Sequence, residues 1–373
     1  LSLVWLAYRA GSAGTRAALR SDRSRVVHAS DGYQGGLLAA ALCAGFPVLV
    51  HYANHTLSEL PSMLCLVAGL TFTAEVVEAS WGPDTRNKAI WAGVLVSAGA
   101  CLRIVNGPLA LVAPTWLLLS RRWHPLQAFL AGALAPVLVF GGVDWITWGS
   151  FAASYVGYVK FNFLEGKAAI FGVESPSWYV ETMFERAPLG LPLMLGLGLV
   201  GTHRTWPYLL TASIAVAYLS TQGHKEERFI VLVWPFLLIA CAITLGTWLA
   251  RSTQRRSLVA GHAVAAALCL LILVDGSRHP PGSFFDQERL ECQAWVGSQR
   301  SARGLMIDNV LLSGGALFFG SRAPLRTYTS SLLDNPLFSH VLTTRGSAAY
   351  AESREHGFRV VRRQGSVVVL ARR

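Results

Sequence analysis

The stretch "HKEERFIVLVWPFLLIACAITLGTWLAR", which spans His224–Arg251, decides the fold class of this chain. Residues 229–250 form an apolar run without a charged side chain, and a helix of about 17–25 such residues crosses the hydrocarbon core of a bilayer. Five ionisable residues in a row, 224–228, stand directly before this run. Charges beside lipid are costly and usually serve a function. The stretch therefore predicts a membrane span that begins at a charged loop.

The composition of the whole chain agrees with this prediction. Of the 373 residues, 53% are hydrophobic and only 14% are charged, and the mean hydropathy is +0.42, whereas soluble domains carry about 25% charged residues. The net charge is +11, but arginines cluster in short loops between the apolar runs and no basic stripe interleaved with aromatics appears, which argues against a nucleic-acid partner. The six cysteines form no C-x-x-C pair, which argues against a disulfide framework or a zinc site. We expect a polytopic membrane protein.

Further apolar runs predict the remaining spans. A long run over 89–120 is interrupted near its middle by Arg103, Asn106 and Pro108. Because one helix of that length would measure about 48 Å at 1.5 Å per residue, two short helices that meet at Arg103 fit a bilayer better. The first predicted span ends at about residue 8. The other predicted spans cover 34–52, 60–77, 125–143, 187–202, 205–222 and 257–274.

Alternation of these spans assigns each loop to one side of the membrane. The short arginine-rich segments, beginning with 9–33, all fall on one side, which the positive-inside rule makes cytoplasmic. The opposite side receives "HTLSE" (55–59), the break at Arg103, the long loop 144–186 and the charged loop 224–228. This gathering of polar segments predicts an active site at the periplasmic or lumenal surface. The prediction depends on the division of 89–120 into two helices.

The C-terminal part of the chain has a different character. Strand-like alternation in "FRVVRRQGSVVVLARR" (358–373) surrounds Gln364–Gly365–Ser366, which predicts a β-hairpin. The segment "RGLMIDNVLLSGGALFF" (303–319) offers another strand. We therefore divide the chain into a membrane domain, 1–275, and a small extramembrane α/β domain within 276–373.

The charged loop 224–228 has two interpretations. Its charges can cancel one another in solvent, or they can hold an anion at the membrane surface. The second is favoured because cations and carboxylates orient one another through charge-assisted hydrogen bonds and because the helix that follows offers its N-terminal N–H groups. A lipid-linked phosphate is the expected ligand, with Arg228 as main contact since its planar fork matches phosphate oxygens. His224 and Lys225 would also contact the phosphate. Glu226 and Glu227 would brace these cations.

Three more polar residues on the same side have open roles. Arg103 either contacts the phosphate or the acceptor, or joins the two halves of a broken helix, since a charge within an apolar run costs a few kcal/mol. Glu59 either positions an acceptor hydroxyl or only complements the dipole at a helix N-terminus. Asp144 has the same choice between an acceptor contact and a polar cap at the end of a span.

Several segments resemble, in order, the polytopic mannosyltransferases that assemble GPI anchors and asparagine-linked glycan precursors. "HKEERF" (224–229) before an apolar run with a proline is the hallmark. "HYANHTLSELPS" (51–62) is similar to the family's Thr-Leu-Ser segment, with His55 where an Arg is often found, and "CLRIVNGPLALVAP" (101–114) matches at Arg103. The long loop resembles the family's lumenal loop, with Trp148 in place of the usual Tyr, at Asp144, Trp148, Gly149, Phe161, Asn162, Phe171, Gly172, Pro176, Trp178 and Tyr179.

The resemblance, which covers about 30–285, implies a GT-C fold and a dolichyl- or polyprenyl-phosphate sugar as donor. It also implies substrate contacts from the long loop, at Asn162, Trp178 and Tyr179. Family members carry acidic residues just after their first span, and one of them is expected to be the catalytic base. By the predicted topology this loop would lie upstream of Leu1, so we expect an N-terminally truncated chain whose weaker candidates for the base are Glu59 and Asp144.

These observations predict a mainly α, GT-C-type bundle of transmembrane helices in the bacterial inner membrane or the endoplasmic reticulum membrane. The predicted activity is inverting transfer of a sugar, most simply mannose, from the lipid phosphate to a hydroxyl of a glycan or glycolipid. No cofactor or metal is expected, because the sequence has no D-x-D motif for a nucleotide-sugar metal. The alternatives are a transporter or lipid-linked-glycan flippase, which would place its polar site near the midplane, and a non-catalytic subunit.

Overall fold

The computed structural model describes residues 1–20, 32–53, 58–201, 204–251, 255–279, 287–308 and 323–372. The chain divides into two compact units, Leu1–Pro281 and Gly282–Arg373. The sequence placed this division at 275/276, whereas the last helix of the first unit continues to Arg278.

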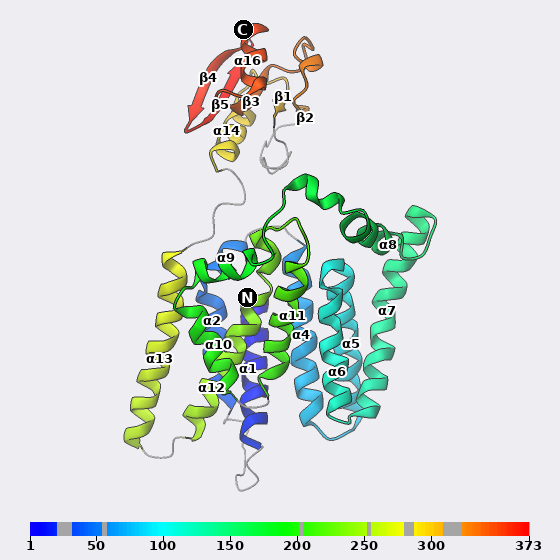
Figure 1. Ribbon diagram of the computed structural model, residues 1–373, viewed down its shortest axis with the longest axis vertical. Coiled ribbons are helices and arrows are strands. Elements are labelled where there is room, and N and C mark those ends of the chain that lie inside the picture. The colour runs from blue at the N-terminus through cyan, green and yellow to red at the C-terminus, as the bar shows by residue number, and fades with distance from the viewer. Residues whose placement is uncertain are drawn as a thin grey trace. The chain divides into compact units, whose positions relative to one another are not determined.

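The first unit is helical, and its long helices run side by side (Figure 1). Four described helical stretches are long and apolar enough to cross a membrane, namely Glu59–Glu78, Trp123–Trp148, Glu227–Arg251 and Val259–Arg278. Two bent pairs raise this number to six, with angles of 62° and 102° at their breaks. The elements are α1 (Ser2–Arg20), α2 (Tyr33–Gly45), α3 (Pro47–Ala53), α4 (Glu59–Glu78), α5 (Pro83–Leu102), η2 (Ile104–Leu111), α6 (Val112–Leu119), α7 (Trp123–Trp148), α8 (Ala153–Val159), η3 (Lys160–Leu164), η4 (Lys167–Phe171), α9 (Trp178–Arg186), α10 (Gly190–Val200), α11 (Trp206–Ser220), η5 (Glu227–Ile230), α12 (Val233–Arg251) and α13 (Arg255–Arg278).

The helix α12 lies at the centre of this unit. It packs against α1, α2, α10 and α11, and side chains all around it are buried, including Trp234, Phe236 and Ile239. A helix that is apolar on every face is a buried one. This explains why residues 229–250 are the most uninterrupted apolar run of the sequence.

The break predicted at Arg103 is present. The helix α5 ends at Leu102, Arg103 has extended backbone angles (φ −146°, ψ 99°), and the chain resumes as η2 and α6. Asn106 donates to Ser62 Oγ over 2.7 Å, and Ser62 Oγ donates to the Gly99 carbonyl over 2.7 Å. These two bonds fix the broken segment to α4 and satisfy a buried amide.

The helix that contains the first predicted span is longer than its apolar run, because α1 continues to Arg20. Arg9 is held inside the helix by an ion pair with Glu75 of α4. Small residues beyond it allow close packing, since a Cβ at Gly11 would overlap Gly35 of α2 and a Cβ at Gly14 would overlap Ile243 of α12. The cluster of arginines in the sequence concealed this helical packing surface.

The long loop also starts later than predicted. The helix α7 continues past Asp144 to Trp148 and ends at Gly149, whose φ of 76° is the left-handed conformation that glycine adopts without strain. The segment from Gly149 to Arg186 then contains α8, η3, η4 and α9. In Figure 1, α8 and α9 lie across one end of the helix bundle instead of along it.

The second unit is a small α/β domain. Its five strands have the order β2-β1-β3-β5-β4, with β1 parallel to both of its neighbours and β5 antiparallel to β3 and β4. The predicted hairpin is confirmed, because β4 ends at Gln364 and β5 begins at Val367. The elements are α14 (Gln287–Ser298), β1 (Leu305–Ile307), β2 (Leu325–Thr327), η7 (Ser330–Leu332), β3 (His340–Thr344), α16 (Ala348–Glu355), β4 (Arg359–Gln364) and β5 (Val367–Ala371).

Candidate active site

Three segments that are distant in the sequence bring charges together in the first unit. Glu59 begins α4, Arg103 follows α5, and Arg228 lies in η5. Arg103 Nη1 lies 2.8 Å from Glu59 Oε1, and Arg228 Nε lies 3.5 Å from the same oxygen. The Glu59 side chain is 5% exposed. A buried carboxylate thus holds two guanidinium groups next to each other. We call Glu59, Arg103 and Arg228 the charge cluster.

An aromatic ring supports the same two guanidinium groups. The Phe229 ring centroid lies 4.7 Å from Arg103 Cζ and 5.3 Å from Arg228 Cζ. Cations within about 6 Å of a ring face are attracted by its quadrupole. Phe229 is the last residue of the "HKEERF" motif, but no contact with the arginines was predicted for it. Because it is also the first residue of the apolar run 229–250, the sequence does not distinguish it from the other apolar residues of that helix.

The charged loop is ordered by its own side chains. Glu226 binds Arg228 with both oxygens, at 2.7 Å from Nε and 2.9 Å from Nη2, and His224 Nε2 lies 3.0 Å from Glu226 Oε1. Such a two-point contact fixes the plane of the guanidinium as well as its position. Glu226 therefore has the contacts of a carboxylate that braces both Arg228 and His224.

Glu227 braces a different cation. Arg186 of α9 donates to it through Nε at 2.7 Å and through Nη2 at 2.8 Å. This ion pair ties the end of the long loop to η5. Arg186 was not predicted as a site residue. The sequence feature that could have indicated it is its position just before the apolar run 187–202.

Lys225 binds backbone carbonyls of the loops around it. Its side chain is buried, and Nζ donates to the carbonyls of Gln222 at 2.5 Å and Glu174 at 3.1 Å. The Glu174 N–H in turn donates to the Gly223 carbonyl over 3.0 Å. Burial lowers the pKa of the Lys225 amine. These contacts tie the long loop to the charged loop, and the phosphate contact of Lys225 stays a prediction.

Asp144 caps a helix. It accepts hydrogen bonds from the Ser154 N–H at 2.8 Å and from Ser154 Oγ at 2.5 Å, and it is 6% exposed. A carboxylate at the start of α8 complements the unpaired N–H groups there. Within the described residues both carboxylate oxygens of Asp144 bind Ser154, so the structure favours the interpretation as a polar cap.

The three predicted residues of the long loop have different surroundings. Tyr179 is fully buried, and its hydroxyl lies close enough to Arg103 and Glu226 to feel their charges. Trp178 packs edge-on against Tyr179, with ring centroids 5.2 Å apart. Asn162 donates to the Tyr158 carbonyl over 2.9 Å and so stabilises its own helical turn. His55 lies outside the described residues.

Among the residues that the structure describes, no group of three or more His, Cys, Asp or Glu side chains is placed to hold a metal ion.

Comparison with known proteins supplies the family. The model of the Alg9-like mannosyltransferase family matches residues 36–278, which include the whole charge cluster. The chain belongs to this family. Similar curated members are GPI mannosyltransferase 4 of Eremothecium gossypii, 28% identical over 57% of this chain and 45% of that protein, and GPI alpha-1,2-mannosyltransferase 3 of Mus musculus, 29% identical over 28% of this chain and 20% of that protein. The chain thus spans less than half the length of these relatives.

A solved structure confirms the fold that the resemblance implied. This Alg9-like chain is similar to ArnT of Cupriavidus metallidurans, crystallised with undecaprenyl phosphate, with a TM-score of 0.61 at 12% identity over 99% of this chain and 83% of that one. The apo crystal structure of the same protein gives a TM-score of 0.59. The GT-C fold is therefore as predicted. The apolar helices and the family membership support the predicted integral membrane location, and the family does not favour the transporter alternative.

Proposed function

We propose that the chain is the membrane domain and appended α/β domain of an inverting glycosyltransferase. It would transfer mannose from a polyprenyl- or dolichyl-phosphate carrier to a hydroxyl of a glycan or glycolipid. Family membership supports the reaction type and the sugar. The carrier is supported by the fold shared with ArnT, a protein crystallised with undecaprenyl phosphate.

The observation that carries the proposal is the pair of guanidinium groups on one ring. Arg103 and Arg228 share Glu59 and Phe229, so both are fixed before a ligand arrives. Arg103 Nε is buried and has no hydrogen-bond acceptor among the described residues. A buried donor without an acceptor is costly, and a phosphate oxygen would satisfy it. His224 would add a third donor, whereas Lys225 would position the loop.

The chemistry follows from charge development. As the bond between the sugar and the phosphate breaks, negative charge grows on the phosphate, and fixed cations that face it lower the barrier. The acceptor hydroxyl needs a base. Glu59 is occupied by two arginines and Asp144 by Ser154, so we assign the base to neither. No cofactor or metal is required by this scheme, because the lipid-phosphate sugar is a co-substrate.

The orientation completes the proposal. Glu59 begins α4 and Arg103 follows the end of α5, whereas Arg86 lies in the first turn of α5 and Arg122 precedes α7. The positive-inside rule assigns the short arginine-rich loops to the cytoplasm. We therefore assign the cluster to the periplasmic or lumenal face.

The test uses the full-length protein in proteoliposomes with radiolabelled undecaprenyl- or dolichyl-phosphate-mannose and a glycolipid extract as acceptor. Transfer is expected from one of these donors, and Arg228→Ala should lower kcat/KM by about 10²–10³-fold. The control is Arg204→Ala, since Arg204 pairs with Glu78 over 2.6 Å outside the cluster. Absence of transfer from both donors contradicts the reaction, and full activity of Arg228→Ala contradicts the role of the cluster.

A further inference from the structure

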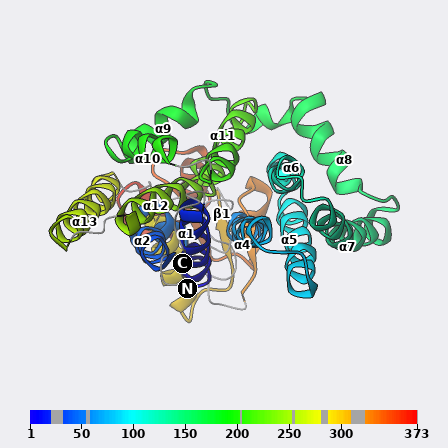
Figure 2. The ribbon, with the colours of Figure 1, turned by 90° about the horizontal axis from the view of Figure 1, so that it is seen from below.

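A polar cavity of about 720 Å³ lies between α1, the end of α4 and the start of α5. Glu75, which lines it, is about 24 Å along α4 from Glu59 at 1.5 Å per residue, so the cavity is separate from the charge cluster. In Figure 2, α1 and α4 are neighbours and α5 lies beside α4. We call it the basic cavity, and its charged lining residues are Arg9, Arg16, Arg20, Lys88, Glu75 and Glu78.

The arginines of the basic cavity form one stripe on α1. Arg9, Arg16 and Arg20 follow one another at intervals of seven and four residues, which places their side chains on the same face of a helix. Ala13 lies between them on that face and also lines the cavity. Its short side chain leaves the space between the guanidinium groups open. The stripe exists because α1 continues to Arg20.

The two carboxylates of the basic cavity already have cationic partners. Glu75 forms an ion pair with Arg9 and lies 3.4 Å from Lys88 Nζ. Glu78 lies 2.6 Å from Arg204 Nη1, which reaches it from the segment before α11. Neither carboxylate is therefore left to neutralise the remaining cations of the cavity.

Two arginines of the stripe supply the excess positive charge. Within the described parts of the chain, neither Arg16 nor Arg20 forms an ion pair. Arg16 is half-buried and packs over Gly32, where a Cβ would lie 2.8 Å from its Nη1. It lies close enough to Arg9 and Arg20 to feel their charges. Like charges at short range repel, so an anion between Arg16 and Arg20 would be stabilising.

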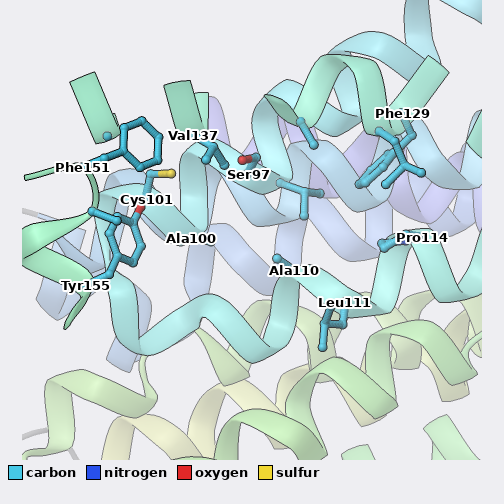
Figure 3. A pocket seen from close by; sticks show the side chains of 15 residues that line it. Ser97, Ala100, Cys101, Ala110, Leu111, Pro114, Phe129, Val137, Phe151 and Tyr155 are labelled. Carbon is cyan, nitrogen blue, oxygen red and sulfur yellow. The ribbon is translucent and has the colours of Figure 1, made fainter. Parts of the chain in front are cut away.

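The chemistry of the lining indicates the class of ligand. The cavity in Figure 3, between α5, η2, α6 and α7, is lined almost entirely by apolar atoms, and its described lining residues include no charged side chain. The basic cavity instead offers guanidinium groups, whose planar fork matches phosphate oxygens. Its volume is in the range of ligand sites, about 300–1,000 Å³.

The place of the basic cavity in the fold indicates the source of the phosphate. Glu78 is the last residue of the apolar stretch Glu59–Glu78, which is long enough to cross a membrane. The cavity therefore lies where this span leaves the hydrocarbon, at the level of the lipid headgroups. Basic pockets between transmembrane helices at this level bind anionic headgroups.

We propose that the basic cavity binds the phosphate of an anionic phospholipid headgroup, with Arg16 and Arg20 as its main contacts. The bound headgroup would neutralise the excess charge of α1 and hold α1 against α4 and α5. The proposal does not depend on sugar transfer, because the site is at the other end of α4 from the charge cluster.

The experiment measures lipid binding by the full-length protein in micelles of a neutral detergent. A ligand that binds only the folded state raises its melting temperature. Phosphatidylglycerol should therefore stabilise the protein, and phosphatidylcholine with the same acyl chains should not. The dependence of the melting temperature on the amount of phosphatidylglycerol gives an apparent dissociation constant.

Charge-removing variants locate the site. Arg20→Gln changes an exposed side chain, so the variant should fold, and its apparent dissociation constant should rise about fivefold, an effect of about 1 kcal/mol. Adding Arg16→Gln should raise it roughly 25-fold in total. The matched control is Arg86→Gln, because Arg86 is exposed, lies in the first turn of α5 and does not line the basic cavity. This control should keep the wild-type constant.

The source of the phosphate is tested with glycerophosphoglycerol, the soluble headgroup without acyl chains. It should not stabilise the protein at the concentrations at which phosphatidylglycerol does. Equal stabilisation by the soluble headgroup would overturn the lipid assignment. Equal stabilisation by phosphatidylcholine would show that the anionic headgroup is not recognised. An unchanged constant in Arg20→Gln and in the double variant, or an equal loss in Arg86→Gln, would show that the basic cavity is not the binding site.

Discussion

Separating Arg186 from Glu227 should release the long loop from the charged loop. The two side chains share two parallel hydrogen bonds of 2.7 and 2.8 Å and are 21% and 15% exposed. Breaking a fully buried pair costs about 3–5 kcal/mol, whereas exposed pairs contribute about 0–1 kcal/mol. Partial exposure places this pair between the two cases. We expect a coupling energy of about 1–3 kcal/mol, which is roughly 5–150-fold in an equilibrium constant.

A double-mutant cycle measures this coupling. Arg186→Met and Glu227→Gln keep the approximate side-chain volume and remove one charge each, and the free energy of unfolding is measured in mixed micelles for the wild type, both single variants and the double variant. The double variant should be less destabilised than the sum of the singles by the coupling energy. Lys167 and Glu165, an exposed pair in the same loop at 2.8 Å, serve as control and should show no measurable coupling.

The cycle can refute the reasoning in two ways. A coupling below about 0.5 kcal/mol would mean that the pair behaves as a loose surface contact. If the coupling is present but Arg186→Met transfers sugar at the wild-type rate, the tether stabilises the fold without positioning the cluster.

Three further predictions concern other parts of the chain. Phe229→Leu removes a cation–π contact worth about 0.5–2 kcal/mol, so KM for the donor should rise roughly 2–30-fold; Phe229→Trp should retain the wild-type value, and an unchanged KM in the Leu variant would contradict the role of the ring. A Cβ in Gly93→Ala would overlap the Phe129 carbonyl between α5 and α7, which should cost about 1–3 kcal/mol of stability. Gly142→Ala meets open space and should leave the melting temperature unchanged. Equal melting temperatures of the two variants would refute the close approach of α5 and α7 at Gly93. Burial lowers the pKa of His340 in β3, so the unfolded chain binds the proton more tightly and stability falls as the pH drops below about 6.5. The protection factors of the β3 amides, which correct for the intrinsic exchange rate at each pH, should fall between pH 7 and 5 in the wild type and less in His340→Asn, and pH-independent protection factors in the wild type would contradict this.

Local composition predicted more of the membrane domain than of the site. The break at Arg103 was readable because a charge and a proline interrupt an apolar run that is too long for one span. The end of α1 could not be predicted from the sequence, because Arg9 forms an ion pair with Glu75, a residue of another helix. The hairpin at Gly365 was readable because it depends on neighbours in sequence.

The site residues divide in the same way. Glu226 could be assigned as a brace because its partners, His224 and Arg228, lie within two residues of it. Glu227 could not be matched with Arg186, and Lys225 could not be matched with the carbonyl of Glu174, because both contacts depend on where α9 and the long loop pack.

The sequence by itself determined that the chain crosses a membrane, that the apolar run over 89–120 breaks at Arg103, and which motif carries the charges. The physical reason is that hydrocarbon thickness and the cost of charge in lipid act on consecutive residues. The tertiary structure alone decided that Glu59, Arg103, Arg228 and Phe229 meet. Packing of helices selects partners by shape across distant segments, and a linear pattern does not contain that information.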